Sequence, residues 1–242
     1  MSGHSKWKNI MHKKEKTDAQ RAKVFTKIGK EMAVAVKEGG PDPVANAKLA
    51  ALIAKAKSLN VPNDNIDRII KKASAADAAD YEEITYEGYG PAGIAVIVEA
   101  TTDSRNRTAG AVRHYFDKFG GNLGTNGCVS FMFEEKGLIV IEKEDVDEDK
   151  LMEDALECGA TDFVAEEEVF EIYTETDDVD AVAAALKEKG YEYVSAEPDK
   201  IPQSYVTLTD EDAIVNMNKL IEALEDDDDI TAFFHNWDEN EG

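Results

Sequence analysis

The side chains best suited to bind a polyanion lie within the first 27 residues of the sequence. Lysines on an extended segment neutralise phosphates and release counterions, which gives an affinity that depends strongly on salt. A tryptophan among them can stack on an unpaired base. We therefore predict a nucleic-acid contact through Lys6, Trp7, Lys8, His12, Lys13, Lys14, Arg21, Lys23 and Lys27. The alternative is a solvated tail that only keeps the protein in solution.

A second group of cations lies in the stretch "TTDSRNRTAGAVRH", from Thr101 to His114. The stretch is expected to cross from the end of a strand into a helix that Asp103 or Ser104 caps. Arginines near a helix N-terminus can bind a phosphate or a carboxylate. Arg105, Arg107 and Arg113 are therefore predicted to contact a phosphate or a partner. The alternative, ion pairs within this acidic chain, stays open.

No other motif indicates catalysis, a metal or a cofactor. His4 and His12 have neither the i, i+4 spacing nor the neighbouring Cys or carboxylate residues of a metal site. The glycine-rich segments "YEGYGPAG" and "GGNLGTNG" are expected to be turns, because no G-K-[ST] follows either of them. The run "EDDDD" lacks the alternating ligands of a calcium loop. We predict that the protein is not an enzyme and that it has no catalytic residues, metal or cofactor.

Charge is distributed very unevenly along the chain, whose formal net charge is −24 over 242 residues. Residues 1–72 have a balance of +9, whereas residues 73–242 have a balance of −33. Such segregation predicts a nucleic-acid partner held at one end only. Two cysteines, 30 positions apart, form no disulfide framework. With no apolar run long enough for a membrane helix, a cytoplasmic protein without a membrane partner is expected. The oligomeric state cannot be predicted.

The elements that must position these residues begin with helices. Residues 1–20 are expected to be a flexible basic arm. Apolar residues then recur every three to four positions from Arg21, over Val44–Leu59 and over Ile66–Ala73. This pattern predicts a three-helix domain over residues 21–78.

Strand and helix patterns alternate after Tyr81. The first strand–helix–strand unit, with strands Ile94–Val98 and Val129–Phe133, lacks a second half, and the closing unit lacks a first half. We expect the two to form one discontinuous domain, residues 79–135 plus 202–242. Residues 136–201, with a last strand at Tyr191–Ser195, form an inserted domain. The fold class is thus α+β, with an N-terminal three-helix domain and two ferredoxin-like βαββαβ-type domains, one inserted in the other. Three independent small units are the alternative.

The segments "GHSKWKNI", "DAQRAKVFTKI", "YEGYGPAGIAVIVEA" and "GGNLG" together resemble the YebC/PmpR family over essentially the whole chain. The resemblance implies a helical domain and two α+β domains, one within the other. It also implies a DNA-binding transcriptional regulator. Because the family includes a mitochondrial translational activator and bacterial members linked to ribosomes stalled on proline-rich sequences, it equally allows a ribosome-associated factor that contacts rRNA or tRNA. Ribosomal or transcription proteins are further partners that it allows.

Several positions depart from the usual family pattern. Lysine replaces a common arginine at Lys13 and Lys30, which removes the planar fork that reads guanine. Gly29 replaces a larger apolar residue within the first helix, and Ala92 replaces a glycine. The glycine is expected to weaken its helix by about 1 kcal/mol, and the alanine to restrict its backbone.

Overall fold

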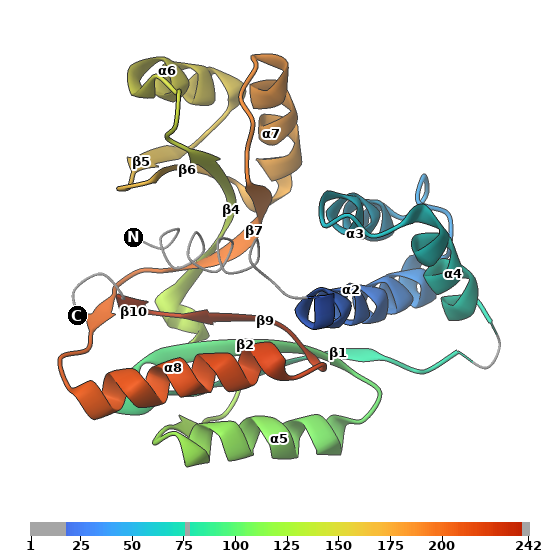
Figure 1. The fold of residues 1–242 in the computed structure, drawn as a ribbon, viewed down its shortest axis with the longest axis vertical. Coiled ribbons are helices and arrows are strands. Elements are labelled where there is room, and N and C mark those ends of the chain that lie inside the picture. The colour runs from blue at the N-terminus through green and yellow to red at the C-terminus, as the bar shows by residue number, and fades with distance from the viewer. Residues whose placement is uncertain (1–17, 76–77, 239–242) are drawn as a thin grey trace. The chain divides into compact units, whose positions relative to one another are not determined.

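The structure is a computed structural model that describes residues 18–75 and 78–238. The described residues form two compact units: one contains residues 18–130 and 208–235, and the other contains residues 131–207 and 236–238. The chain is a mixed α+β protein in which N-terminal helices precede two sheets with their own helices (Figure 1). This agrees with the predicted fold class.

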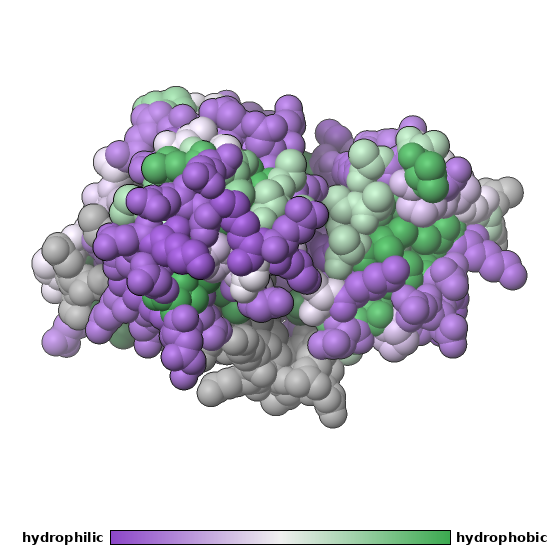
Figure 2. All heavy atoms as spheres, turned by 90° about the horizontal axis from the view of Figure 1, so that it is seen from above, coloured by the Kyte–Doolittle hydropathy of each residue, from purple (hydrophilic) through white to green (hydrophobic). Residues whose placement is uncertain are grey.

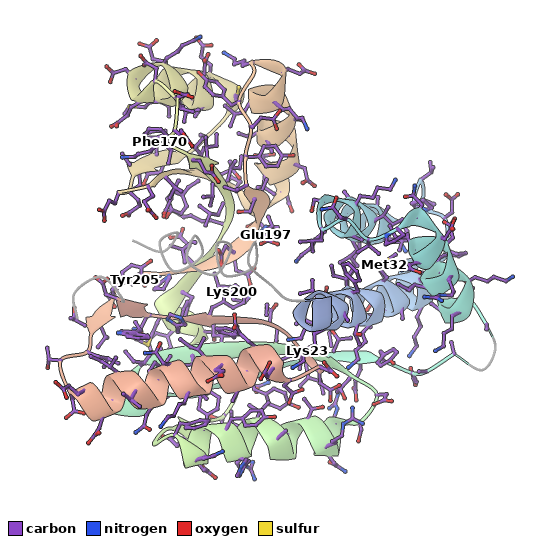
Figure 3. All side chains as sticks on the ribbon, in the orientation of Figure 1. Lys23, Met32, Phe170, Glu197, Lys200 and Tyr205 are labelled. Carbon is purple, nitrogen blue, oxygen red and sulfur yellow. The ribbon has the colours of Figure 1, made fainter. Side chains whose placement is uncertain are left out.

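The N-terminal helices are α2 (Asp18–Gly39), α3 (Ala47–Ser58) and α4 (Asn63–Ala73). Their shared core contains Met32 and Leu49, both fully buried, and Figure 3 shows Met32 between the helices. Helix α2 begins at Asp18, three residues before Arg21, where the helical pattern was predicted to begin. Helix α3 begins later than predicted because the Asn46 side chain caps it, accepting from the Leu49 amide at 3.0 Å. Figure 2 shows hydrophobic residues gathered over these helices.

The first sheet is antiparallel, with the strand order β3-β1-β2-β9. It contains β1 (Glu82–Tyr89), β2 (Ala95–Thr102), β3 (Asn122–Leu123) and β9 (Ile230–His235). Its helices are α5 (Arg105–Lys118) and α8 (Glu211–Asp226), which pack against each other. Strand β9 comes from the end of the chain and pairs with β2, which comes from the middle. The predicted four-segment division of the chain stays a prediction.

Two strand predictions in this sheet are wrong. Tyr86–Tyr89 was expected to be part of a turn but lies in β1. The strand predicted over Val129–Phe133 is wrong because Ser130–Met132 forms a 3-10 turn, and only Phe133 lies in a strand, as the first residue of β4 (Phe133–Glu142). Gly88 explains the first error: a Cβ on it would lie 2.6 Å from the Asn122 carbonyl oxygen. The glycine permits the close approach of β3 to β1 rather than a turn.

The second sheet has the strand order β5-β6-β4-β7 and is also antiparallel. Its strands are β4 (Phe133–Glu142), β5 (Asp162–Ala165), β6 (Val169–Thr174) and β7 (Ser195–Pro202), and its helices are α6 (Glu148–Cys158) and α7 (Val179–Glu188). The chain order β-α-β-β-α-β with this strand order is ferredoxin-like. The predicted strand Tyr191–Ser195 shares only its last residue with β7, which begins at Ser195, so this strand was predicted too early in the sequence.

Both helices of this unit cover the same face of the sheet. Ile139, Phe170 and Leu186 meet in the core between them, and Figure 3 shows Phe170 between β6 and α6. Two short strands, β8 (Val206–Thr207) and β10 (Trp237–Asp238), pair in parallel as a separate ribbon. Single 3-10 turns at Pro91–Gly93 and Thr176–Asp178 complete the described elements.

Candidate nucleic-acid interface

The lysines of α2 meet an acidic segment, residues 225–229, at the end of α8 and the following turn. Lys23 Nζ lies 2.8 Å from Asp226 Oδ1, and Lys27 Nζ donates to the Glu225 carbonyl oxygen at 2.7 Å. Lys30 Nζ lies 2.7 Å from Asp229 Oδ1 and donates to the Asp228 carbonyl oxygen. Two residues of the predicted nucleic-acid contact, Lys23 and Lys27, therefore have anionic or carbonyl partners in this chain.

Asp229 is the centre of this junction. Its carboxylate also accepts from Arg107 and Thr108, both at 2.8 Å. Burial raises the pKa of Asp229, but the hydrogen bonds from Lys30, Arg107 and Thr108 outweigh burial and lower the pKa to about 2. Both Lys30 and Asp229 are largely out of water, with side-chain exposures of 12% and 9%. The pair therefore fastens α2 to the start of β9.

The arginines of α5 also meet carboxylates of the chain. Arg105 holds Glu82 through two guanidinium nitrogens, at 3.1 and 2.5 Å, and Arg107 adds Asp103 to its contact with Asp229. Arg113 is exposed and has no ion pair among the described residues. The side chain of Ser104 occupies the N-cap position of α5 without a capping hydrogen bond. Intramolecular pairing, the alternative left open above, describes the contacts of Arg105 and Arg107, and phosphate binding by all three arginines stays a prediction.

Helix α4 carries cations of a different kind. Arg68, Lys71 and Lys72, which we call the α4 cation patch, are exposed and form no ion pair with any described residue. Arg68 donates only to the side-chain oxygen of Asn65, at 3.1 Å. The spacing i, i+3, i+4 places the three on one face, opposite the face that Ile66 buries. The sequence prediction missed this patch, although "RIIKK" contains its signal: charges at helical spacing around apolar core residues.

The remaining predicted contact residues cannot be placed. Lys6, Trp7, Lys8, His12, Lys13 and Lys14 lie outside the described residues, and so does the side chain of Arg21. Within the described part of the chain, no three His, Cys, Asp or Glu side chains gather as a metal would require. None of the described helices is both long and apolar enough to span a membrane.

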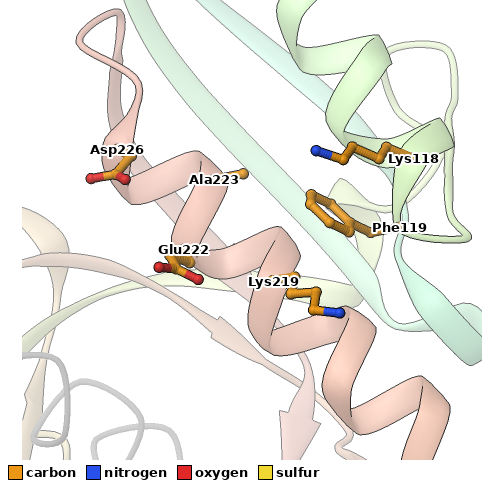
Figure 4. Close-up of a pocket in the computed structure, with 6 residues that line it drawn as sticks. All are labelled: Lys118, Phe119, Lys219, Glu222, Ala223 and Asp226. Carbon is orange, nitrogen blue, oxygen red and sulfur yellow. The ribbon is translucent and has the colours of Figure 1, made fainter.

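A surface hollow lies between the end of α5 and the second half of α8 (Figure 4). It is an open depression of 440 Å³. Two lysines and two carboxylates share it with an aromatic ring: Lys118, Phe119, Lys219, Glu222, Ala223 and Asp226. Since no nucleophile and base are paired among these residues, this hollow gives no support to a catalytic role.

Fold and charge together define a mixed α+β protein with exposed cations on an N-terminal helical region. The chain belongs to the TACO1/YebC family, as its sequence motifs predicted. The model of the TACO1/YebC N-terminal domain matches residues 5–76, and the model of the second and third domains matches residues 81–237.

Relatives in this family match this sequence over nearly their full length. A protein of Acetivibrio thermocellus is 62% identical over 98% of this chain and 99% of its own, and one of Finegoldia magna is 54% identical over 98% and 99%. Both are named probable transcriptional regulatory proteins. The crystal structure of a conserved hypothetical protein from Aquifex aeolicus is 44% identical, covers 92% of both chains and superposes with a TM-score of 0.83. The names of the Acetivibrio and Finegoldia relatives describe regulators rather than enzymes.

Proposed function

We propose that this protein is a cytoplasmic, DNA-binding regulator of transcription that holds phosphates with its basic N-terminal residues and with the α4 cation patch. The patch carries the proposal, because its three cations are exposed and no carboxylate among the described residues neutralises them. Almost all the surplus acid lies beyond residue 72. DNA is therefore held at the helical end and repelled by the rest of the molecule.

The contact is with the phosphate backbone rather than with base edges. Sequence readout in the major groove uses arginine, asparagine or glutamine side chains in bidentate contacts. Helix α4 offers one arginine, Arg68, and its guanidinium already donates to Asn65. Lys71 and Lys72 act as point charges. Binding is expected to position the protein on the duplex, with DNA shape supplying what selectivity there is.

Lys23 and Lys27 belong to the proposed interface conditionally. Because each has a partner in the acidic segment, a phosphate must displace that segment before it can use them. The primary interface is thus the α4 cation patch together with Lys6, Trp7, Lys8, His12, Lys13 and Lys14, while Arg105, Arg107 and Arg113 remain secondary candidates.

The proposal is tested by titrating the full-length protein into labelled duplex DNA at several salt concentrations and following fluorescence anisotropy. Replacing Lys6, Lys8, Lys13 and Lys14 together with alanine should weaken binding and reduce the slope of log K against log salt by roughly 3 to 4 units, at about 0.9 per phosphate contact. An unchanged slope would show that these lysines do not contact phosphate.

A second candidate function is a ribosome-associated translation factor that contacts rRNA or tRNA. The shortage of base-reading side chains on α4 favours it, since RNA is recognised largely through shape, backbone and stacking on aromatic side chains such as Trp7. Sedimenting cell lysate on a gradient, with the intact chain and with a chain lacking residues 1–17, separates the two functions. Co-migration with ribosomes that the deletion abolishes would favour translation. Absence from ribosomes, with salt-sensitive binding to one promoter above random DNA, would favour transcription.

A further inference from the structure

The loop that follows β3, residues 124–130, is fastened to β1 by one carboxylate. Glu87 of β1 is buried, and its carboxylate accepts three hydrogen bonds of 2.7 to 2.9 Å from backbone amides of the loop, those of Gly127, Val129 and Ser130. The Glu87 carbonyl oxygen also accepts from the Gly124 amide, at 2.8 Å. We call these four contacts the Glu87 clamp.

The carboxylate in the clamp is ionised at neutral pH. Burial raises the pKa of Glu87, but the hydrogen bonds from the three amides outweigh burial and lower the pKa below its ordinary value. Hydrogen bonds to an ionised acceptor are about twice as strong as those between neutral groups. The clamp therefore holds the loop more firmly than a neutral side chain would.

A tight turn lies at the tip of the clamped loop. The Cys128 amide donates to the Thr125 carbonyl oxygen at 3.1 Å, so Asn126 and Gly127 are the two central residues of the turn. Gly127 has a φ of 87°, whereas Asn126 has no positive φ, a combination that defines a type II turn. Both residues are exposed.

Asn126–Gly127 is the single Asn–Gly pair in the sequence, and such a pair can react with itself. The Gly127 nitrogen loses its proton and attacks the side-chain carbonyl carbon of Asn126, which closes an imide ring. The side-chain nitrogen leaves as ammonia and takes up a proton. Water then opens the ring at either carbonyl, leaving aspartate or isoaspartate. Glycine is the least hindered residue at the attacking position because it has no side chain.

The folded loop opposes this reaction in two ways. A type II turn sets ψ of its first central residue at about 120°, which rotates the Gly127 nitrogen away from the Asn126 side chain that it must attack. The Gly127 amide proton is also held by the Glu87 carboxylate, and removing this proton would place two negative charges side by side. The reaction therefore requires the loop to leave the clamp.

We propose that Asn126 is a modification site, at which the chain slowly converts its own asparagine to aspartate or isoaspartate, and that the Glu87 clamp sets the rate. Conversion proceeds from the small population of molecules in which the loop is locally open. This proposal does not depend on nucleic-acid binding.

The conversion cannot be undone by the loop itself. Both products add a carboxylate next to Gly127, whose amide lies 2.7 Å from a carboxylate oxygen of Glu87. Isoaspartate also adds one carbon to the main chain between Gly124 and Gly127, both of which bind Glu87. The modified loop should therefore leave the clamp permanently.

The first experiment compares the full-length protein with a synthetic peptide of residues 120–131 at mildly alkaline pH. Mass spectrometry of tryptic digests follows the replacement of the Asn126 amide by a carboxylate. The peptide should react fastest and the wild type slowest. Glu87→Gln should react at least roughly tenfold faster than the wild type, because a charged acceptor is lost. A wild type as fast as the peptide, or no acceleration in Glu87→Gln, would overturn the proposal.

Two variants serve as controls for this comparison. Glu83→Gln makes the same change on the same strand, at an exposed residue whose carboxylate pairs with Lys48 at 2.9 Å, and should leave the rate unchanged. Asp229→Ala weakens the junction with α2 without touching the loop. An acceleration in Asp229→Ala as large as that in Glu87→Gln would mean that conversion follows global unfolding, which would overturn the role of the clamp.

Hydrogen exchange tests what the modification does to the loop. The three amides that donate to Glu87 should exchange roughly tenfold faster in aged, converted protein and in Asn126→Asp than in fresh wild type, because each has lost its acceptor. Asn122→Asp adds the same charge at an exposed residue of β3 and should leave their exchange unchanged. Full protection of the three amides in converted protein would overturn the inferred loss of the clamp.

Discussion

Helices α2 and α4 carry comparable positive charge, but described carboxylates of the chain neutralise only the charge on α2. Lys23, Lys30 and Lys37 of α2 each form an ion pair with an aspartate. Lys71 and Lys72 of α4 form none with described residues. In a protein of net charge −24, the cations available to a partner are those that tertiary structure keeps away from acid. Counting lysines along the sequence cannot identify them.

The largest expected effect comes from removing a carboxylate that neutralises α2. Asp229→Ala removes the carboxylate that Lys30 and Arg107 share. The site is largely buried, since the side chains of Lys30 and Asp229 are 12% and 9% exposed. Removing one member of a buried pair typically costs about 3 to 5 kcal/mol. The free energy of unfolding, measured by urea titration, should fall by about 3 kcal/mol.

Asp226→Ala is the matched control for this change. Asp226 pairs with Lys23 in a contact where the side chains are 64% and 38% exposed. Such surface pairs contribute less than about 1 kcal/mol. Equal losses from the two alanine variants would mean that Asp229 does not fasten α2.

The next largest effect concerns the exposed cations of α4. Lys71→Ala with Lys72→Ala removes two exposed cations that form no ion pair within residues 18–75 and 78–238, so stability should change little. Affinity for duplex DNA should fall roughly fiftyfold at 0.1 M salt, because about 0.9 counterions are released per phosphate contact. Lys37→Ala with Lys48→Ala removes the same charge from lysines paired with Asp80, Glu38 and Glu83. A loss of affinity as large in this control would show that only total charge matters.

Acid should remove the contribution that ionised Asp229 makes to the free energy of unfolding. The pKa of Asp229 is lowered to about 2 in the folded chain, below its value of about 3.9 when unfolded. The folded state therefore releases this proton more readily, and its stabilisation is complete above pH 4 and disappears as the pH falls towards 2. The difference in unfolding free energy between the wild type and Asp229→Asn should shrink by about 2 kcal/mol over that range. A difference that does not depend on pH would contradict the lowered pKa.

Comparing these two proteins also removes the effect of His235. Burial lowers the pKa of His235 to about 4, so its neutral form is favoured in the folded state. The unfolded state gains its proton from about pH 6.5 downward, and stability is lost between there and pH 4. Because both proteins contain His235, this loss cancels in their difference.

The smallest effects concern backbone positions rather than charges. A Cβ at Gly29 of α2 would meet Ile69 Cδ1 of α4 at 3.4 Å, an ordinary contact, and Gly29→Ala should stabilise the chain by about 1 kcal/mol. Ala92 has a positive φ of 53°, which an alanine adopts at a cost of about 1 to 2 kcal/mol. Ala92→Gly should therefore be stabilising as well. Thermal unfolding checks both, and a lower midpoint in either variant would contradict its prediction.

Much of the fold followed from periodicity. Helical spacing predicted the core positions Ile28, Met32 and Leu49, all of which are buried. The errors occurred where a glycine or a contact between distant residues determines the local structure. Strand β1 was missed because Gly88 signals a turn locally, although the role of this glycine depends on Asn122, 34 residues further along. Pairing partners at such separations have no local pattern.

The candidate site was less predictable than the fold for an electrostatic reason. The sequence marks every cation equally, so Lys23 and Lys27 ranked with the others, whereas Arg68, Lys71 and Lys72 were missed. Only the structure brings residues 225–229 to α2, about 200 positions away. Residue type predicts the chemistry of a side chain, but its availability depends on neighbours that are distant in the sequence.

The position of β9 also constrains how the protein is made. Strand β2 pairs on one side with β1, which precedes it, and on the other with β9, which begins at Ile230 of 242 residues. During synthesis the β2 edge, with its fully buried run Val96–Val98, remains unpaired until β9 (Ile230–His235) has emerged. Strands β4 to β7 are complete by Pro202 and can pair earlier. The first sheet is therefore the part of the nascent chain most exposed to aggregation, because an unpaired apolar edge recruits other strands.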